Sequence, residues 1–187
     1  DVKSLEKDYD ALMIAIGAQG ASSMRIEGED TEGVYAGIEY LGKVARGENP
    51  PVGSKVLVVG GGNTAIDASR TSLRAGADVT ILYRRTRAEM PASDFEIEEA
   101  EEEGVKIDYL VAPVSITRNG KILKVKCIRM AQGEPDASGR RRPVPVEGSE
   151  FEIEADTVIG AIGQRVLPDC IKPLGIEIDR SGNIVAN

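Results

Sequence analysis

A glycine-rich pattern inside residues 55–85 constrains the fold of this chain more than any other feature. A short apolar run, 55–59, is rich in valine, which is typical of a strand buried on both faces. The spacing Gly60-x-Gly62-x-x-Ala65 follows at once, and small or apolar residues then recur with helical spacing until Gly76. A second β-branched run closes the segment. This order of strand, turn, helix and strand predicts an α/β, Rossmann-like fold built on a parallel sheet.

The glycine turn predicts a site for the pyrophosphate of a dinucleotide. Gly60 permits the tight turn, Gly62 lets the backbone approach phosphate, and Ala65 lets the helix pack closely on the sheet. The first turn of the helix then offers N–H groups and a dipole to the phosphates. A tight strand–helix turn without a ligand is the alternative. The expected binding residues are Gly60, Gly61, Gly62, Asn63, Thr64 and Ala65.

The end of the second strand predicts which dinucleotide binds. NAD sites usually place a carboxylate there for the ribose 2′-hydroxyl, whereas this chain has Tyr83-Arg84-Arg85, with Arg87 close behind. Guanidinium groups attract a 2′-phosphate, so we expect NADP(H) at Arg84, Arg85 and Arg87. A solvated basic turn is the alternative.

Composition excludes several classes of function. The 187 residues suit one domain, and the net charge of −8 argues against nucleic acid or an anionic membrane as partner. The sequence has no membrane-length apolar run or signal peptide. It has no histidine, which excludes Ser-His triads and histidine metal sites. Cys127 and Cys170 form no C-x-x-C pair, so we expect small buried residues and a reducing cytoplasm.

The remaining segments predict further elements on both sides of the central unit. The first half predicts a buried strand at 9–17, a loop at 19–33, and a helix from Val34 to Ala45. A helix with a solvated glutamate face is expected from Asp94 to Glu103, capped by Ser93 and stopped by Gly104. A third parallel strand is expected at 105–111.

The second half departs from the parallel pattern. Asn119-Gly120 predicts a hairpin between 113–118 and 121–131. Residues 132–148, with Arg140 to Arg142, are expected to form an exposed loop, with a partner-docking patch as the alternative. A strand at 151–154, in which apolar and charged residues alternate, is expected to complete an antiparallel β insertion in the parallel sheet. A buried strand with a glycine turn is then expected at 156–164, followed by two short strands at 174–179 and 182–185.

Three of these stretches together resemble a known family. Residues 58–68, Tyr83-Arg84-Arg85 with Met90-Pro91, and 156–164 are similar to the NADPH domain of the small (beta) subunit of glutamate synthase and of related two-dinucleotide flavoproteins. The resemblance implies an NADPH domain, residues 1–187, excised from a larger FAD-containing subunit. Segments 1–17 and 157–187 would then border the FAD domain. Iron–sulfur clusters and a large catalytic subunit would lie outside this chain.

The resemblance also implies a function, hydride transfer from NADPH to FAD in an FAD-dependent NADPH oxidoreductase, with the fragment alone inactive. Asp67 would orient the nicotinamide end, unless it is only a first-turn helix charge. Ala161, Ile162, Gly163 and Gln164 would lie near the nicotinamide, unless they only end a strand. Two alternatives stay open: a self-standing NADP-binding sensor and a small NADP-dependent dehydrogenase.

Overall fold

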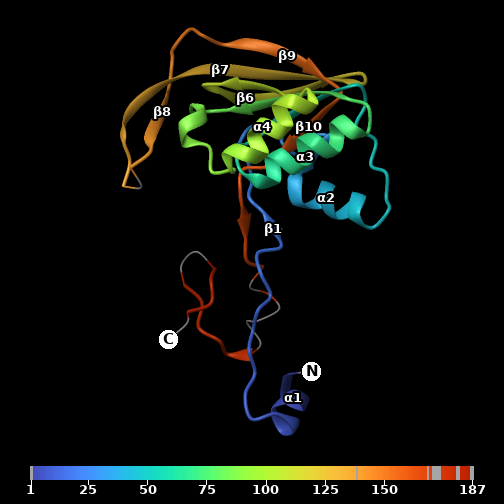
Figure 1. The fold of residues 1–187 in the computed structure, drawn as a ribbon, viewed down its shortest axis with the longest axis vertical. Helices are drawn as coiled ribbons and strands as arrows, with labels where there is room; N and C mark the ends of the chain where they lie inside the picture. Colours follow the sequence, from blue (N-terminus) through green and yellow to red (C-terminus); the bar gives the residue numbers. More distant parts are fainter. Residues whose placement is uncertain (1, 138, 168, 170–173, 180–181, 186–187) are drawn as a thin grey trace. The chain divides into compact units, whose positions relative to one another are not determined.

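The computed structural model describes residues 2–137, 139–167, 169, 174–179 and 182–185. It divides into two compact units (Figure 1). One comprises residues 21–163, and the other comprises 1–20 together with 164–187. Cys170 lies outside the described residues, so its predicted burial stays a prediction.

A five-stranded parallel sheet forms the centre of the larger unit. Its order is β2-β10-β3-β4-β5, and every neighbouring pair is parallel. The strands are β2 (Val34–Ala36), β10 (Thr157–Gly160), β3 (Lys55–Val59), β4 (Asp78–Tyr83) and β5 (Lys106–Tyr109). This arrangement confirms the predicted α/β fold, with β3, α3 (Asn63–Arg74) and β4 as its βαβ unit.

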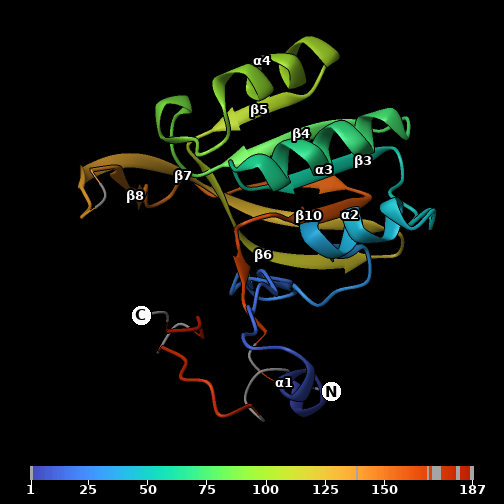
Figure 2. The ribbon, with the colours of Figure 1, turned by 60° about the horizontal axis from the view of Figure 1, so that its bottom comes forward.

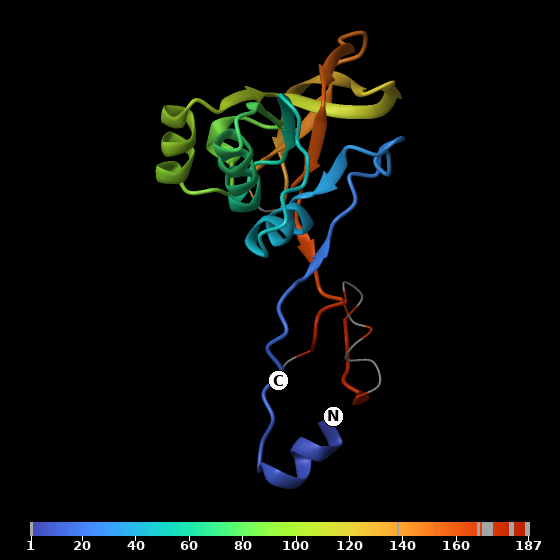
Figure 3. The same cartoon turned by 90° about the vertical axis from the view of Figure 1, so that its right-hand side faces the viewer.

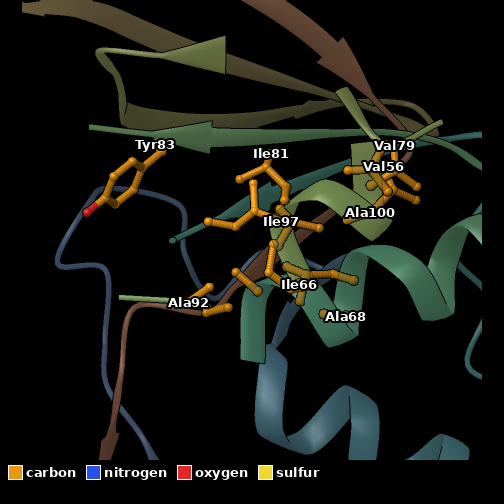
Figure 4. Close-up of a cluster of buried hydrophobic side chains, with 14 of the residues drawn as sticks. Val56, Ile66, Ala68, Val79, Ile81, Tyr83, Ala92, Ile97 and Ala100 are labelled. Atoms are coloured by element: carbon orange, nitrogen blue, oxygen red, sulfur yellow. The ribbon is translucent and has the colours of Figure 1, made fainter. Parts of the chain in front are cut away.

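One face of the sheet packs against helices (Figure 2). These are α2 (Gly37–Ala45), α3 and α4 (Asp94–Glu103). Val56 and Val58 of β3 belong to this core, together with Ile81 of β4 and Ile97 of α4 (Figure 4). Side chains alternate across a strand, so the intervening Leu57 and Val59 reach the other face. Burial on both faces explains the unbroken apolar run.

The other face packs against an antiparallel sheet (Figure 3). It contains β6 (Val111–Asn119), β7 (Ile122–Pro135), β8 (Arg141–Pro145) and β9 (Phe151–Ala155). The hairpin at Asn119-Gly120 is confirmed by the pairing of β6 with β7. Cys127 is buried in this second core, as predicted.

α4 begins and ends as predicted, and its glutamates are mostly exposed as expected, although some of them form ion pairs. The Ser93 hydroxyl accepts the backbone N–H of Glu96, and Gly104 ends the helix at φ +110°. Arg70 of α3 pairs with Glu99 and Glu103, and Arg74 also reaches Glu103. The opposite charges on α3 therefore draw part of the acidic face into contacts between the two helices.

Two predictions for the larger unit are wrong. Residues 34–36 form β2 rather than the first turn of a helix, because Val34 and Ala36 pair with β10. Residues 132–148 are not a loop throughout. β7 continues to Pro135, and β8 returns along it with Met130 opposite Pro145. In both places, pairing with a distant strand overrides the local signal.

The smaller unit also departs from expectation. It contains α1 (Val2–Asp8), followed by a stretch at 9–19 without strand structure, so the predicted buried strand is wrong. Most of this apolar stretch is exposed, and Met13 is 89% exposed. The two-residue strands β1 (Gly20–Ala21) and β11 (Gln164–Arg165) pair with each other in a separate two-stranded sheet. In place of the two expected terminal strands, the described residues there form the antiparallel bridge Ile178–Ile184, flanked by backbone hydrogen bonds from Asp179 to Asn183 and from Val185 to Glu177.

Candidate nucleotide-binding site

A pocket of about 420 Å³ lies at the carboxyl ends of β3, β4 and β10. Ligands of open α/β sheets bind at this edge, beyond the strand ends. The β3–α3 turn, the end of β4 and the residues after β10 supply most of its wall. Of the predicted site residues, the pocket is lined by Gly60, Gly61, Gly62, Thr64, Arg84, Arg85, Ala161, Ile162 and Gly163.

The three glycines of the turn have different surroundings. A Cβ on Gly60 would lie 2.2 Å from the carbonyl oxygen of Ala161, and one on Gly61 would lie 2.5 Å from the Tyr83 ring. Both glycines are therefore required by the fold itself. A Cβ on Gly62 would meet only the Pro91 ring, at 3.6 Å, and the φ of Gly62 is an ordinary −97°. The fold leaves space at Gly62, on the pocket wall, where a phosphate group can approach the backbone.

Helix α3 begins at this turn, with Gly62 as its N-cap. Ala65 is fully buried under the sheet, and its N–H donates to the Gly62 carbonyl at 2.8 Å. The side chain of Ala65 thus contributes packing and does not line the pocket. Asn63 and Asp67 are exposed on α3 and do not line it either. The helix N-terminus still places its dipole beside the glycine turn.

The three predicted arginines have different surroundings. Arg84 is exposed on the pocket wall and forms no ion pair with any residue that the structure describes. Arg85 is 11% exposed; its Nη2 donates to Asp136 Oδ2 at 3.0 Å, and its Nε donates to the Arg141 carbonyl at 2.9 Å. Arg87 does not line the pocket. It pairs with Glu98 and Glu101 of α4, and Glu101 raises the pKa of Arg87.

Tyr83 forms the buried floor beside these arginines. Its hydroxyl points away from the apolar cluster (Figure 4) and donates to the Glu89 carbonyl at 2.7 Å. Burial raises the pKa of Tyr83, against the opposing effect of Arg85 and Arg140. The hydrogen bond from Thr86 lowers the pKa of Glu89, whose carboxylate completes a capping box with Thr86 around the short 3₁₀ turn η1 (Arg87–Glu89). The phenol and the turn are therefore fixed structural supports.

The segment after β10 closes the pocket on its other side. The Ala161 N–H donates to the Val59 carbonyl at 2.8 Å, and the Ser22 N–H donates to the Gly163 carbonyl at 3.0 Å. Met24 and Ile26 add an apolar wall. Gln164 begins β11 and does not line the pocket.

Sequence reasoning missed one charged residue of the pocket, Arg140, which comes from the connection between β7 and β8. The basic run that contains it was visible in the sequence, but nothing local connects that run to the glycine turn. Within the described part of the chain, no cluster of acidic residues or cysteines is suited to hold a metal. None of its helices is long and apolar enough to cross a membrane.

The profile of a protein family matches the whole chain. The family is described as pyridine nucleotide-disulphide oxidoreductase, and the match covers residues 1–187. The chain belongs to this family. Membership confirms the expected family, the pyridine nucleotide oxidoreductases, and supports NADP(H) and FAD as the cofactors of proteins of this kind.

Two bacterial relatives are longer than this chain, which aligns with only part of each of them. The chain is 47% identical to the NADPH-Fe(3+) oxidoreductase subunit beta of Geobacter sulfurreducens, covering 98% of this chain and 28% of that protein. It is 41% identical to the glutamate synthase [NADPH] small chain of Escherichia coli, covering 97% of this chain and 42% of that protein. The chain thus spans less than half the length of these relatives.

Solved structures share the fold. FprA from Mycobacterium tuberculosis in complex with NADPH matches with a TM-score of 0.81 at 21% identity, covering 99% of this chain and 56% of FprA. Thioredoxin reductase from Lactococcus lactis matches with a TM-score of 0.66 at 21% identity, covering 91% of this chain and 50% of that chain.

Proposed function

We propose that residues 1–187 form the NADPH-binding domain of a larger cytoplasmic flavoprotein, in which NADPH delivers a hydride to FAD. The observation that carries this proposal is the space at Gly62. The turn fits tightly at Gly60 and Gly61, yet it is open at Gly62, on a pocket whose wall also carries Arg84. This combination suits a dinucleotide with a 2′-phosphate.

In this proposal each wall of the pocket holds one part of the nucleotide. The backbone from Gly60 to Gly62 and the first turn of α3 hold the pyrophosphate, and Arg84 attracts the 2′-phosphate. Ala161 to Gly163 lie on the side assigned to the nicotinamide. The cofactors supply the redox chemistry, whereas this chain binds and orients NADPH. Segments 1–17 and 157–187 border the FAD domain.

The outlying predicted residues receive lesser roles. Arg87 is already paired with α4, so it stabilises the turn that carries Arg84. Asn63 and Asp67 are exposed on α3 outside the pocket and contact no part of the nucleotide in this proposal, and Gln164 acts through the backbone of β11. The family match favours this oxidoreductase function over a nucleotide sensor without redox activity.

The test compares NADPH and NADH binding to the full-length protein by calorimetry. Arg84→Ala removes a charged hydrogen bond worth about 1.5–3 kcal/mol, so NADPH affinity should fall about ten- to a hundredfold while NADH affinity stays nearly constant. Arg46→Ala is the matched control, because Arg46 is exposed, pairs with Glu48 and does not line the pocket. Equal losses for both nucleotides in Arg84→Ala would contradict the proposal.

The final electron acceptor needs a separate assay. Identity to the E. coli small chain supports a role as the electron-donating subunit of a glutamate synthase, whereas the Geobacter relative favours Fe(3+) as acceptor. NADPH oxidation by the full-length protein with a ferric chelate, compared with glutamate formation in the presence of a large subunit, separates the two. Activity in neither assay would contradict both assignments.

A further inference from the structure

We propose that the β7–β8 hairpin is part of the nucleotide site and that its Arg140 binds the 2′-phosphate together with Arg84. In this arrangement Arg85 and Asp136 are positioning residues that attach the hairpin to the end of β4. The inference rests on the proposed function above and names a further residue that determines its cofactor specificity.

The first observation is the position of Arg140. It lines the same pocket as Arg84 and Arg85, although it comes from the connection between two antiparallel strands. Its neighbours Arg141 and Arg142 do not line the pocket. The positive charge of Arg140 also acts to lower the pKa of Tyr83, at the buried floor of the pocket. Only one of the three consecutive arginines is thus placed where a bound anion would meet it.

The second observation is that the hairpin is attached to the turn after β4 at two places. Near the tip, Arg85 donates to the Asp136 carboxylate at 3.0 Å and to the Arg141 carbonyl at 2.9 Å. Further along β7, the Gln132 amide lies 3.3 Å from Thr86 Oγ1 and 3.4 Å from Glu89 Oε1. These bonds join the hairpin to the segment that follows Arg84, so the two arginines that face the pocket are held on one connected support.

Asp136 links the two halves of this support. One carboxylate oxygen receives Arg85, while the other receives the backbone N–H of Arg140 at 3.3 Å. The Asp136 N–H in turn donates to the Arg140 carbonyl at 2.7 Å. The Arg85 and Asp136 side chains are only 11% and 23% exposed, which makes their ion pair less screened than one on the open surface. Asp136 therefore fixes the backbone that carries Arg140.

The strand pairing of the hairpin is irregular where this contact begins. The pairing of β7 with β8 shifts between Gln132 and Pro135. Gly133 lies inside the shift, and a Cβ there would come within 2.8 Å of Val144 Cγ2. β-Bulges turn a strand and redirect side chains, often beside functional sites. We infer that this irregularity turns the tip of the hairpin toward β4, where Arg140 lines the pocket.

Contacts and position assign the roles. The Arg85 guanidinium bonds to the Asp136 carboxylate and to the Arg141 carbonyl, which suits it to hold the hairpin in place. Arg84 and Arg140 approach the pocket from different elements, so together they can hold one phosphate from two sides. Recognition of the 2′-phosphate thus requires both the end of β4 and the β7–β8 hairpin, which follows β5 and β6 in the chain.

The test measures NADPH and NADH affinity for the full-length protein, with adenosine 2′,5′-bisphosphate and ADP as probes of the adenosine half. Arg140→Ala should weaken NADPH and the 2′,5′-bisphosphate about tenfold or more, and should change NADH and ADP less than about twofold. Arg140→Lys should restore part of the loss, because it restores the charge. Arg142→Ala, an exposed neighbour that does not line the pocket, should change none of the four affinities.

Asp136→Asn tests the positioning role. It should lower the NADPH-to-NADH preference by less than Arg140→Ala does, and the double variant should lose no more than Arg140→Ala alone. A merely structural defect would weaken both nucleotides alike, and circular dichroism monitors the fold of each variant.

The outcomes separate this inference from the function on which it rests. A wild-type protein that does not prefer NADPH contradicts the proposed function. A second possible result is a wild-type preference for NADPH that Arg84→Ala abolishes and Arg140→Ala does not change. That result overturns only the role of the hairpin. Equal losses in Arg140→Ala and Arg142→Ala also overturn it, because they would reflect general surface charge.

Discussion

The Asp156 carboxylate accepts a hydrogen bond from the backbone N–H of Ser54 at 2.8 Å, although 102 positions separate the two residues. The same oxygen accepts the N–H of Lys55 at 2.9 Å. The Asp156 N–H completes the contact by donating to the Lys55 carbonyl at 2.9 Å. This contact aligns the beginnings of β3 and β10, so it also sets how far each strand extends toward the pocket at the other end.

We therefore expect Asp156→Ala to destabilise the fold. It removes the acceptor of two exposed backbone N–H groups, and each lost hydrogen bond costs about 0.5–1.5 kcal/mol. Asp156→Asn keeps one acceptor oxygen and should lose less. Thermal or urea unfolding of the full-length protein measures both. Glu150→Ala, at an exposed position, is the control and should stay within about 0.5 kcal/mol of wild type. An Asp156→Ala variant as stable as this control would contradict the structural role.

Substitutions at two adjacent glycines should affect different properties, stability at Gly61 and nucleotide binding at Gly62. Gly61→Ala places a Cβ 2.5 Å from the Tyr83 ring and should lower stability, because the buried ring has little room to move. Gly62→Val has an allowed backbone conformation, and its Cβ would meet the Pro91 ring at an ordinary 3.6 Å, so it should fold and fail to bind NADPH. Circular dichroism and nucleotide titration of the two variants measure these effects. A folded Gly62→Val variant with wild-type affinity would show that phosphate does not approach this turn.

The ion pairs of Glu103 between α3 and α4 should keep their contribution to stability in mild acid. The hydrogen bond from Arg70 lowers the pKa of Glu103 from 4.5 to about 2. A carboxylate with a lowered folded-state pKa adds stability that is complete above pH 4.5 and is lost as the pH falls toward 2. The stability difference between wild type and Glu103→Gln should therefore shrink across this range.

Glu102→Gln provides the control for this titration. Glu102 is exposed on the same helix and forms no ion pair with the described residues. Its difference from wild type should change less with pH than that of Glu103→Gln. Parallel behaviour of the two variants would refute the assignment to Glu103.

The thiol of Cys127 should be inert in the folded protein. Burial, assisted by the charge of Asp108, raises the pKa of Cys127 to about 12, and the side chain is fully buried. The thiolate is the reactive form, so iodoacetamide at pH 8 should leave Cys127 unmodified until the protein is unfolded in urea. Peptide mass spectrometry identifies the labelled cysteine. Rapid labelling of Cys127 in native protein would show that the second core opens readily.

The central βαβ unit could be predicted because its signals are local. Glycine spacing, valine-rich strands and the Gly76 stop all lie within the unit that they specify. The cap and C-terminal glycine of α4 were equally local. The turn after β3 was predictable for the same reason, and so were the arginines that follow β4.

Long-range pairing accounts for the parts that could not be predicted. β2 exists because β10 lies beside it, and β8 exists because a bent β7 lies beside it. Arg140 joins the pocket only through this second pairing and through the Asp136 contact with Arg85. The apolar stretch at 9–17 shows the opposite error: composition favoured a buried strand, whereas the described neighbours leave Tyr9 65% exposed.

The place of β10 between β2 and β3 has a consequence for the newly made chain. The ribosome produces this strand last of the five, yet it occupies an inner position with a partner on each side. Until about residue 160 emerges, β2 and β3 lack their shared neighbour, and each presents an unpaired edge. Such late, long-range pairing slows folding and exposes intermediates to aggregation. Truncation just before β10 should therefore produce an aggregating chain instead of a smaller folded domain.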